Sequence, residues 1–255
     1  MTKVRAALVA TAAMLVFATS AAGVVFGEPD GERHPSVGAL LAPEAYPDGT
    51  WASCTGTLIS PTVFLTAAHC DWGLSRMAVT FDSSYDPDTG TEYWGTWHAD
   101  PAYRSAASDP HDLAVVVFDE PVTGITPARL PAAGSLANLP ANQSFTSVGY
   151  GAQSVTIDHG PVFNYADVRY VSTAHRLNAT NKSWLRISMN PKHGDGGPCF
   201  GDSGGPNFLG AGAQETNVVA GTTITGDSMC RATNVIYRLD TESARSFLGQ
   251  FVQLP

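Results

Sequence analysis

The sequence predicts an all-β protein, on three observations. Short runs of β-branched and apolar residues recur between residues 37 and 224. Clusters of Gly, Pro, Asp and Asn separate these runs, and 25 Gly and 17 Pro indicate many turns. A clear helical pattern occurs only near the end of the chain. Many strands at short spacing favour a barrel or a sandwich.

The predicted strands cover residues 37–42, 55–68, 77–81, 113–118, 145–151, 168–173, 185–189 and 217–224. Between the fourth and the fifth strand, residues 121–143 are rich in Pro, Gly and small side chains. Such a composition indicates a connector between two β domains. We therefore expect one domain over residues 24–125 and a second over residues 126–255.

The last predicted element is a helix that docks on the second domain. Its apolar residues recur at helical spacing and follow two candidate capping residues, Asp240 and Thr241. The apolar positions are Ala244, Phe247, Leu248 and Phe251.

Residues 1–23 are typical of a secretion signal. Lys3 and Arg5 give a positive start, residues 6–18 form an apolar stretch, and Ala21-Ala22-Gly23 offers small residues for cleavage. A membrane anchor is the alternative, but the apolar stretch is short for a span of about 20 residues. Without the signal, 12 basic and 23 acidic residues remain. We expect a secreted, acidic protein that binds neither nucleic acid nor a membrane.

Four cysteines remain in the exported chain: Cys54, Cys70, Cys199 and Cys230. An even number in a secreted protein favours two disulfides. Three connectivities are possible, and pairing each cysteine with its near neighbour needs the least chain reach. The sequence has no C-x-x-C pair, which argues against zinc.

Two short motifs carry the chemistry, LTAAHC at residues 65–70 and GDSGGP at residues 201–206. The second motif also satisfies the G-x-S-x-G pattern of α/β-hydrolases, but that fold needs its histidine after the serine. All seven histidines precede Ser203, which excludes it. The order Asp, His, Ser would use Asp30 or Asp48, and neither has a suggestive context. The order His, Asp, Ser remains.

Ser203 needs a base, because a free hydroxyl is a weak nucleophile. His69 is the best candidate, since it closes a predicted strand and is tied by the neighbouring Cys70. Asp112 opens the buried strand HDLAVVVF, where a charge is costly unless it is used. It is therefore the candidate that orients His69. Asp109 is its rival, in a polar turn.

The sequence resembles the trypsin/chymotrypsin-like serine proteases. TGTLISPTVFLTAAHC, HDLAVVVF and GPCFGDSGGP are similar, in order and approximate spacing, to the three catalytic blocks of that family. The resemblance covers about residues 24–252. It implies two six-stranded antiparallel β-barrels with the active site in the cleft between them.

The resemblance implies a serine endopeptidase that works through an acyl-enzyme. Ser203 would attack the peptide carbonyl, His69 would move the proton, and Asp112 would orient His69. The backbone N–H groups of Gly201 and Ser203 would form the oxyanion hole. No cofactor or metal is implied. The implied partners are polypeptide substrates and a protein inhibitor, and we expect a monomer.

The resemblance also implies the disulfides Cys54–Cys70, beside the histidine, and Cys199–Cys230, across the specificity pocket. Further disulfides that are common in animal members are missing from the sequence. The chain is therefore more similar to a bacterial secreted member.

The floor of the family's specificity pocket corresponds to Gly197, six residues before the nucleophile. Trypsin-like enzymes carry an Asp there, so we expect a neutral pocket that accepts apolar residues. Thr225 and Gly226 correspond to the opposite wall. Ile224 stands where the family usually has the serine that helps hold the triad aspartate. This departure predicts weaker orientation of Asp112.

In the family a freed apolar amino terminus folds inward, and its ammonium pairs with the Asp that precedes the nucleophile. Val24-Val25-Phe26-Gly27 resembles the family's mature start, and the acceptor would be Asp202. We predict that one cut after Gly23 removes the signal and also activates the protein.

Two other functions fit the same residues. One is a protease-like binding protein with weak catalysis, which Ile224 favours. The other is an esterase that uses the same triad, because the same acyl chemistry cleaves esters.

Overall fold

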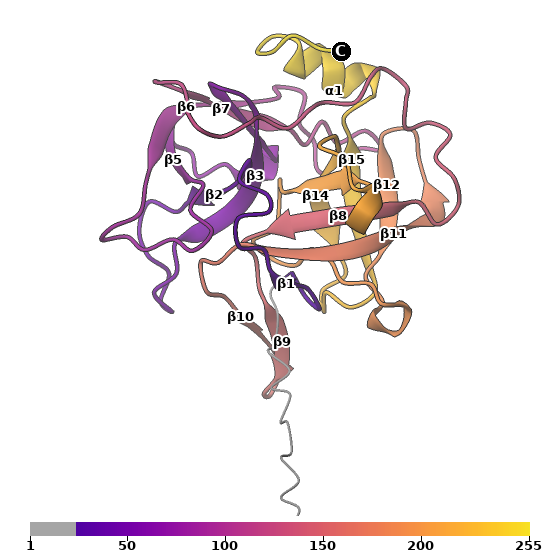
Figure 1. The fold of residues 1–255 in the computed structure, drawn as a ribbon, viewed down its shortest axis with the longest axis horizontal. Helices are drawn as coiled ribbons and strands as arrows, with labels where there is room; N and C mark the ends of the chain where they lie inside the picture. The colour runs from indigo at the N-terminus through magenta and orange to yellow at the C-terminus, as the bar shows by residue number, and fades with distance from the viewer. Residues whose placement is uncertain (1–23) are drawn as a thin grey trace, which may run out of the picture.

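The computed structural model describes residues 24–255, apart from the side chains of residues 178–180, so the predicted signal peptide lies outside the described residues. The strands form two closed antiparallel barrels side by side, and one α-helix follows the last strand (Figure 1). The prediction of two six-stranded antiparallel β-barrels with a C-terminal helix is confirmed.

The first barrel closes in the order β2-β3-β4-β7-β6-β5. Its strands are rich in β-branched residues, such as AVVVF in β7, which suit a pleated surface. Inside it, the rings of Phe64, Phe81 and Phe118 lie 5.8 to 6.2 Å apart. Its strands are β2 (Val37–Leu41), β3 (Ala52–Ser60), β4 (Val63–Thr66), β5 (Arg76–Thr80), β6 (Tyr93–Ala99) and β7 (Ala114–Phe118).

The second barrel closes in the order β11-β12-β15-β14-β13-β8, because β8 also pairs with β11. The short strand β1 (Glu28–Pro29) adds to β11, so the start of the described chain packs on the second barrel before the chain enters the first. The barrel strands are β8 (Ser144–Gly149), β11 (Tyr170–Thr180), β12 (Trp184–Ser188), β13 (Pro206–Leu209), β14 (Val219–Gly226) and β15 (Thr233–Arg238).

The helix α1 (Glu242–Leu248) begins after Thr241, whose hydroxyl accepts the N–H of Ala244. This confirms Thr241 as the cap and the buried apolar face of the helix. Phe251, which the spacing assigned to the helix, lies beyond its end and packs its ring 5.2 Å from that of Phe247. Three short 3-10 helices cover Ala68–Cys70, Pro191–His193 and Gly212–Gln214.

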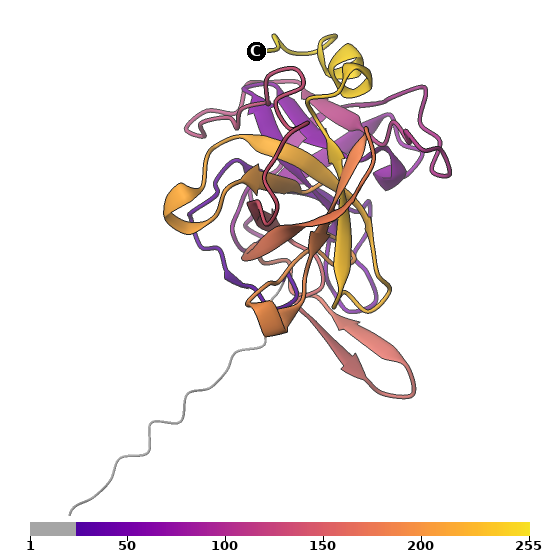
Figure 2. The same ribbon diagram turned by 90° about the vertical axis from the view of Figure 1, so that its right-hand side faces the viewer.

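The strands β9 (Ser154–Ile157) and β10 (Pro161–Asn164) form a hairpin outside the barrels. It projects from the molecule at the end opposite to α1 (Figures 1 and 2). Sequence patterns did not predict this hairpin, nor β6, β13 and β15. The residues of β6, β13 and β15 alternate too little between apolar and polar to be recognised locally, and the two hairpin strands are only four residues each.

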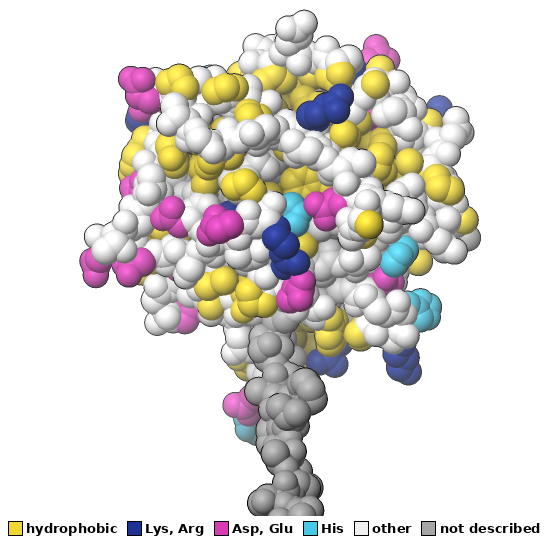
Figure 3. Space-filling model, viewed as in Figure 1, with side chains coloured by type: hydrophobic (Ala, Val, Ile, Leu, Met, Phe, Trp, Pro, Cys, Tyr) yellow, Lys and Arg dark blue, Asp and Glu magenta, His cyan; other side chains and the backbone are white. Residues whose placement is uncertain are grey.

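Buried apolar side chains form one cluster that extends across both barrels and α1, and further clusters lie within each barrel. The barrels therefore share part of their core. Acidic side chains are spread over the face shown in Figure 3, while Lys and Arg stand singly or in small groups. Among residues 24–255, no helix has the length and apolar character needed to cross a bilayer.

Candidate active site

The motif residues lie where the two barrels meet. His69 belongs to the 3-10 helix that follows β4, and Asp112 comes shortly before β7 of the same barrel. Ser203 comes from the second barrel, shortly before β13. Its carbonyl accepts the N–H of Thr55, on β3 of the first barrel, at 2.9 Å. The serine loop is thus fixed against the barrel that carries His69.

His69 and Asp112 are joined by two hydrogen bonds. The ring Nδ1 of His69 lies 2.7 Å from Oδ2 of Asp112, and the backbone N–H of His69 donates to Oδ1 at 3.0 Å. The carboxylate is buried, while the imidazole is 28% exposed. Since Nδ1 donates to the carboxylate, Nε2 carries the lone pair and is free to accept a proton.

Asp109, the rival candidate, lies elsewhere. Its Oδ1 accepts the hydroxyl of Tyr237 at 2.5 Å, and its Oδ2 lies 3.9 Å from the ring of His111. Within the described residues, no hydrogen bond joins it to His69. The structure therefore brings Asp112, and not Asp109, to the candidate base.

Ser203 is half-buried in a tight turn between Gly201 and Gly204, at φ +92° and +78°. A Cβ on Gly204 would lie 2.2 Å from the hydroxyl of Thr66, so only glycine fits there. In residues 24–255, the hydroxyl of Ser203 makes no hydrogen bond to His69. Such bonds often tighten only when substrate binds.

The backbone N–H groups at this turn are available to a ligand. Those of Gly204 and Gly205 donate to Thr223 and Asp202. By contrast, the N–H groups of Gly201 and Ser203 donate to no acceptor among the described residues. Two free donors beside a candidate nucleophile are the arrangement that an oxyanion requires.

Asp202 is buried beneath the turn. Its carboxylate accepts the N–H groups of Gly151 and Cys199, both at 2.8 Å. Burial outweighs these bonds and raises its pKa to about 7. Within the described residues no cation pairs with Asp202. A carboxylate in such surroundings would be stabilised by a positive charge.

The segment after the predicted cleavage site lies against the predicted pocket. Val24 is fully buried, and Val25 forms an antiparallel bridge with Gly197. The N–H of Gly197 donates to the carbonyl of Val25 at 3.0 Å. With residue 23 attached, the nitrogen of Val24 is an amide and carries no charge.

Of the predicted pocket residues, Thr225 and Gly226 lie on β14, and Gly197 lies in the segment that precedes the turn of Ser203. Thr225 pairs with Val235, and Gly226 pairs with Asn234, across β14 and β15. Asn234 is buried, and a Cβ on Gly226 would lie 3.3 Å from its side-chain oxygen. Sequence reasoning missed Asn234.

Three further residues adjoin the predicted pocket residues in space or in sequence: Met189, Asp195 and Ile224. A Cβ on Gly197 would lie 2.5 Å from the side chain of the buried Met189, another residue that the sequence did not single out. Asp195, two residues before Gly197, lies 2.5 Å from the ring Nδ1 of His175. Ile224 is partly buried and packs against the shared core.

Both cysteine pairs form disulfides, Cys54–Cys70 and Cys199–Cys230. The first ties β3 to the 3-10 helix that carries His69, and the second ties the serine loop to the loop between β14 and β15. The sulfurs of Cys54 and Cys70 lie within 4.8 Å of a His69 ring nitrogen. Because these sulfurs are bonded to each other, they offer no thiolate to a metal.

A cavity of about 420 Å³ opens beside the serine turn. Its lining is mainly aromatic and apolar, and Gly201 contributes to it. Phe200 is 49% exposed there, and its ring lies 4.7 Å from that of Phe163 on β10. Its other lining residues are Tyr46, Pro47, Asp48, Thr50, Ala52, Ser53 and Tyr165.

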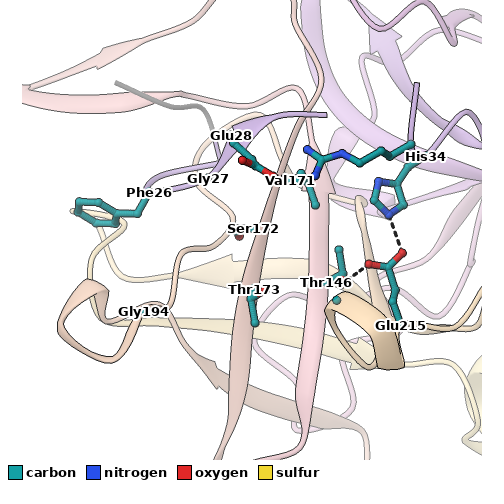
Figure 4. A pocket seen from close by; sticks show the side chains of 12 residues that line it. Phe26, Gly27, Glu28, His34, Thr146, Val171, Ser172, Thr173, Gly194 and Glu215 are labelled. Carbon is teal, nitrogen blue, oxygen red and sulfur yellow. Dashed lines mark hydrogen bonds and ion pairs between the residues drawn. The ribbon is translucent and has the colours of Figure 1, made fainter. Parts of the chain in front are cut away.

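A second cavity, of about 640 Å³, shares no lining residue with the candidate catalytic set (Figure 4). At its edge, His34 bonds Asp30 through Nδ1 and Glu215 through Nε2, the latter at 2.7 Å. The fully buried Arg169 donates to Asp30 at 2.8 Å. We call Asp30, His34, Arg169 and Glu215 the His34 cluster.

The His34 cluster holds its histidine as a cation. Burial would lower the pKa of His34, but the hydrogen bonds to Asp30 and Glu215 outweigh burial and raise the pKa to about 9. Although burial would raise the pKa of Asp30, hydrogen bonds to His34 and Arg169 bring it below its usual value. No sequence motif marked this cluster.

Comparisons with known proteins agree with the fold. A human heparin binding protein superposes with a TM-score of 0.65 at 16% identity, over 89% of this chain and 95% of the other. An atomic-resolution structure of HBP gives the same score and identity, over 90% and 96%. No curated protein matches the chain. The trypsin family profile matches residues 32–245, so the chain belongs to the trypsin family.

Proposed function

We propose that this protein is a serine endopeptidase that cleaves peptide bonds through an acyl-enzyme. The observation that carries the proposal is the double hydrogen bond between Asp112 and His69. It fixes both the position and the tautomer of the imidazole and leaves Nε2 as a base. The turn that holds Ser203 is anchored on the same barrel.

In this mechanism Nε2 of His69 takes the proton of the Ser203 hydroxyl as its oxygen attacks the substrate carbonyl. The buried Asp112 stabilises the imidazolium that forms. The proton then passes to the leaving amine, and the C–N bond breaks. Water hydrolyses the ester by the same steps in reverse order, with His69 again acting as the base.

The free N–H groups of Gly201 and Ser203 support an oxyanion hole. Both donors belong to the backbone of a turn whose glycines fix its shape, so they need little reorganisation during the reaction. Loss of one such donor costs roughly 100- to 1,000-fold in rate.

For specificity we propose a neutral pocket bounded by Gly197, Thr225 and Gly226. The side chain of Asp195 is engaged by His175 and not by the residues of this pocket. The aromatic cavity beside Gly201 gives room for apolar substrate residues near the scissile bond. Chromogenic peptides ending in Phe, Leu or Ala should be cleaved faster than one ending in Arg, and the reverse order would contradict this pocket.

We also propose activation by cleavage after Gly23. The ammonium of a freed Val24 would pair with Asp202, and the burial of Val24 together with its neighbour's bridge to Gly197 supports this. A chain beginning at Val24 should be at least about tenfold more active than one with Gly23 attached. Equal activities of the two purified chains would overturn the idea.

The secreted and bacterial origin belongs to the same proposal. Two disulfides favour an oxidising compartment, and the framework of only these two pairs resembles bacterial members. Sequencing the amino terminus of the exported protein tests this, because a start far downstream of Val24 argues against the signal.

A fluorescent phosphonate that phosphonylates reactive serines, forming an O–P bond with loss of its leaving group, tests the whole proposal. Wild-type protein should be labelled on Ser203, whereas Ser203→Ala and His69→Ala should not. His159→Ala is the matched control, because the His159 side chain is fully exposed on the hairpin. Labelling that survives in His69→Ala would remove His69 as the base.

A weakly catalytic binding protein and an esterase are the alternatives. The first predicts no labelling of the wild type, and the second predicts labelling with turnover of esters but not of peptides. Heparin binding, named for the similar human structure, is disfavoured here, because the chain has a formal charge of −9.

A further inference from the structure

The carboxylate of Asp112 has few bonds to hold it. In the part of the chain that the structure describes, both hydrogen bonds that it accepts come from His69. A buried carboxylate with donors from one residue can move together with that residue. The orientation of the Asp112 carboxylate must then depend on how the backbone of Asp112 is held.

That backbone forms a very tight turn. The carbonyl of His111 accepts the N–H of Leu113 at 2.9 Å, which closes a three-residue turn around Asp112. The carbonyl of Leu113 then accepts the N–H of Asp100 at 2.9 Å. His111 itself lies at φ +51°, in the left-handed region that residues with a Cβ rarely adopt.

The ring of His111 is clamped between two carboxylates. Its Nδ1 lies 3.0 Å from Oδ2 of Asp100, and its Nε2 lies 3.9 Å from Oδ2 of Asp109. Asp100 directly follows β6 and accepts the N–H of Ala102 at 2.9 Å, so it is fixed to the first barrel. A strained backbone conformation persists where the surroundings hold it in this way.

Asp109 links the clamp to the second barrel. The hydroxyl of the fully buried Tyr237, on β15, donates to its Oδ1 at 2.5 Å. The same hydroxyl lies 3.1 Å from that of Ser243 on α1. Although burial would raise the pKa of Asp109, the hydrogen bonds from Tyr237 and Ser243 outweigh burial and lower it, so Asp109 remains an anion.

We propose that His111 is a positioning residue for Asp112. Its ring, held by Asp100 and Asp109, keeps the turn in the conformation that aims the Asp112 carboxylate at both donors of His69. The clamp also ties this turn to the second barrel and α1, which contribute no hydrogen bond to the Asp112 carboxylate among the described residues. The inference rests on the proposed protease function.

Three substitutions separate the ring from the backbone conformation. Glycine adopts a positive φ freely but has no ring, asparagine tolerates it and can bond Asp100, and alanine does neither. We expect His111→Gly and His111→Ala to lose about 10- to 100-fold in kcat, the range expected for misplaced catalytic groups. KM should stay within about twofold, and His111→Asn should keep at least about a third of kcat.

The matched control is His159→Gly. His159 is also a histidine at positive φ, +53°, beside an aspartate, but it lies on the exposed hairpin. Its substitution should leave kcat unchanged. A His111→Gly variant with wild-type kcat would overturn the proposal, since the backbone alone would then suffice. If His111→Gly does not fold, Asp100→Asn tests the same clamp and should lower kcat in the same way.

A spectroscopic readout keeps this test separate from the activity itself. The proton on Nδ1 of His69, bonded to Asp112, gives its own resonance in proton NMR spectra. His111→Gly should broaden or shift it, while His159→Gly should not. A wild type that shows this resonance but is never labelled on Ser203 defeats the protease proposal alone. An active protein whose resonance and kcat survive His111→Gly defeats the positioning role alone.

Discussion

His69 and His34 are both bonded to aspartates, yet they differ in how many carboxylates face them. His34 lies between Asp30 and Glu215, so both ring nitrogens donate and its pKa rises to about 9. His69 faces one carboxylate, on Nδ1, and no hydrogen bond engages its Nε2 within residues 24–255. A histidine held on both sides is a fixed cation, whereas one held on a single side can exchange a proton.

The largest effect should come from Asp112→Asn. The amide cannot hold Nδ1 as a donor, so the ring can adopt the wrong tautomer, and kcat/KM should fall by about 10,000-fold. The matched control is Asp158→Asn, because Asp158 faces His159 at 3.7 Å on the surface. Kinetics with one peptide substrate measures both, and a loss below tenfold in Asp112→Asn would place the site elsewhere.

The opposite pattern is expected for His34→Ala. This change leaves Asp30 and Glu215 without the cation they share, and it should lower the free energy of unfolding by about 3 kcal/mol. Activity per folded molecule should stay within about twofold, because in residues 24–255 no hydrogen bond joins the cluster to a candidate catalytic residue. Urea denaturation monitored by tryptophan fluorescence measures the free energy of unfolding. Unchanged stability would show that His34 is not a structural cation.

The pH dependence of stability sharpens the comparison. The pKa of His34 is raised from 6.5 to about 9 in the folded chain, so folding favours its protonated form. This stabilisation is complete below pH 6.5 and is lost as the pH rises through 9. Thermal melts across this window should show a decline in wild type that is smaller in His34→Ala. Parallel curves for the two proteins would refute the assignment.

The smallest effect should come from Glu215→Gln. The amide oxygen can still accept from Nε2 of His34, and Asp30 still faces Nδ1, so we expect a loss of about 1 kcal/mol. With one carboxylate removed, the pKa of His34 should fall and the alkaline decline should begin at lower pH. A loss as large as in His34→Ala would mean that Glu215 carries the whole cluster.

Short sequence motifs were enough to identify the candidate site residues that lie close together in sequence. LTAAHC and GDSGGP are each a few residues long, and the order of histidine, aspartate and serine needs no distance information. The fold followed from the strand pattern and the resemblance. The His34 cluster could not be found this way, because Arg169 is 139 residues from Asp30, and Glu215 is 181 residues from His34.

The predicted pocket wall shows a second limit of sequence-based prediction, which is the register between paired strands. Counting along the chain assumes that β14 and β15 pair without interruption, but their register shifts between Thr223 and Thr225. This irregularity decides which residue of β15 faces Gly226, and it places Asn234 there. The position of such a bulge depends on packing across the barrel, which a single sequence does not reveal.

Arg169 links the two barrels, and this link affects how the molecule unfolds. Arg169 immediately precedes β11 of the second barrel. Its buried guanidinium donates to the carbonyls of Val37 and Phe81 in the first barrel, both at 3.0 Å. Separation of the barrels would break both of these hydrogen bonds, which a charged donor makes across the interface. The two barrels therefore form one cooperative unit, and calorimetry should record a single transition. The half of the chain that carries the serine cannot be expected to fold when it is expressed alone.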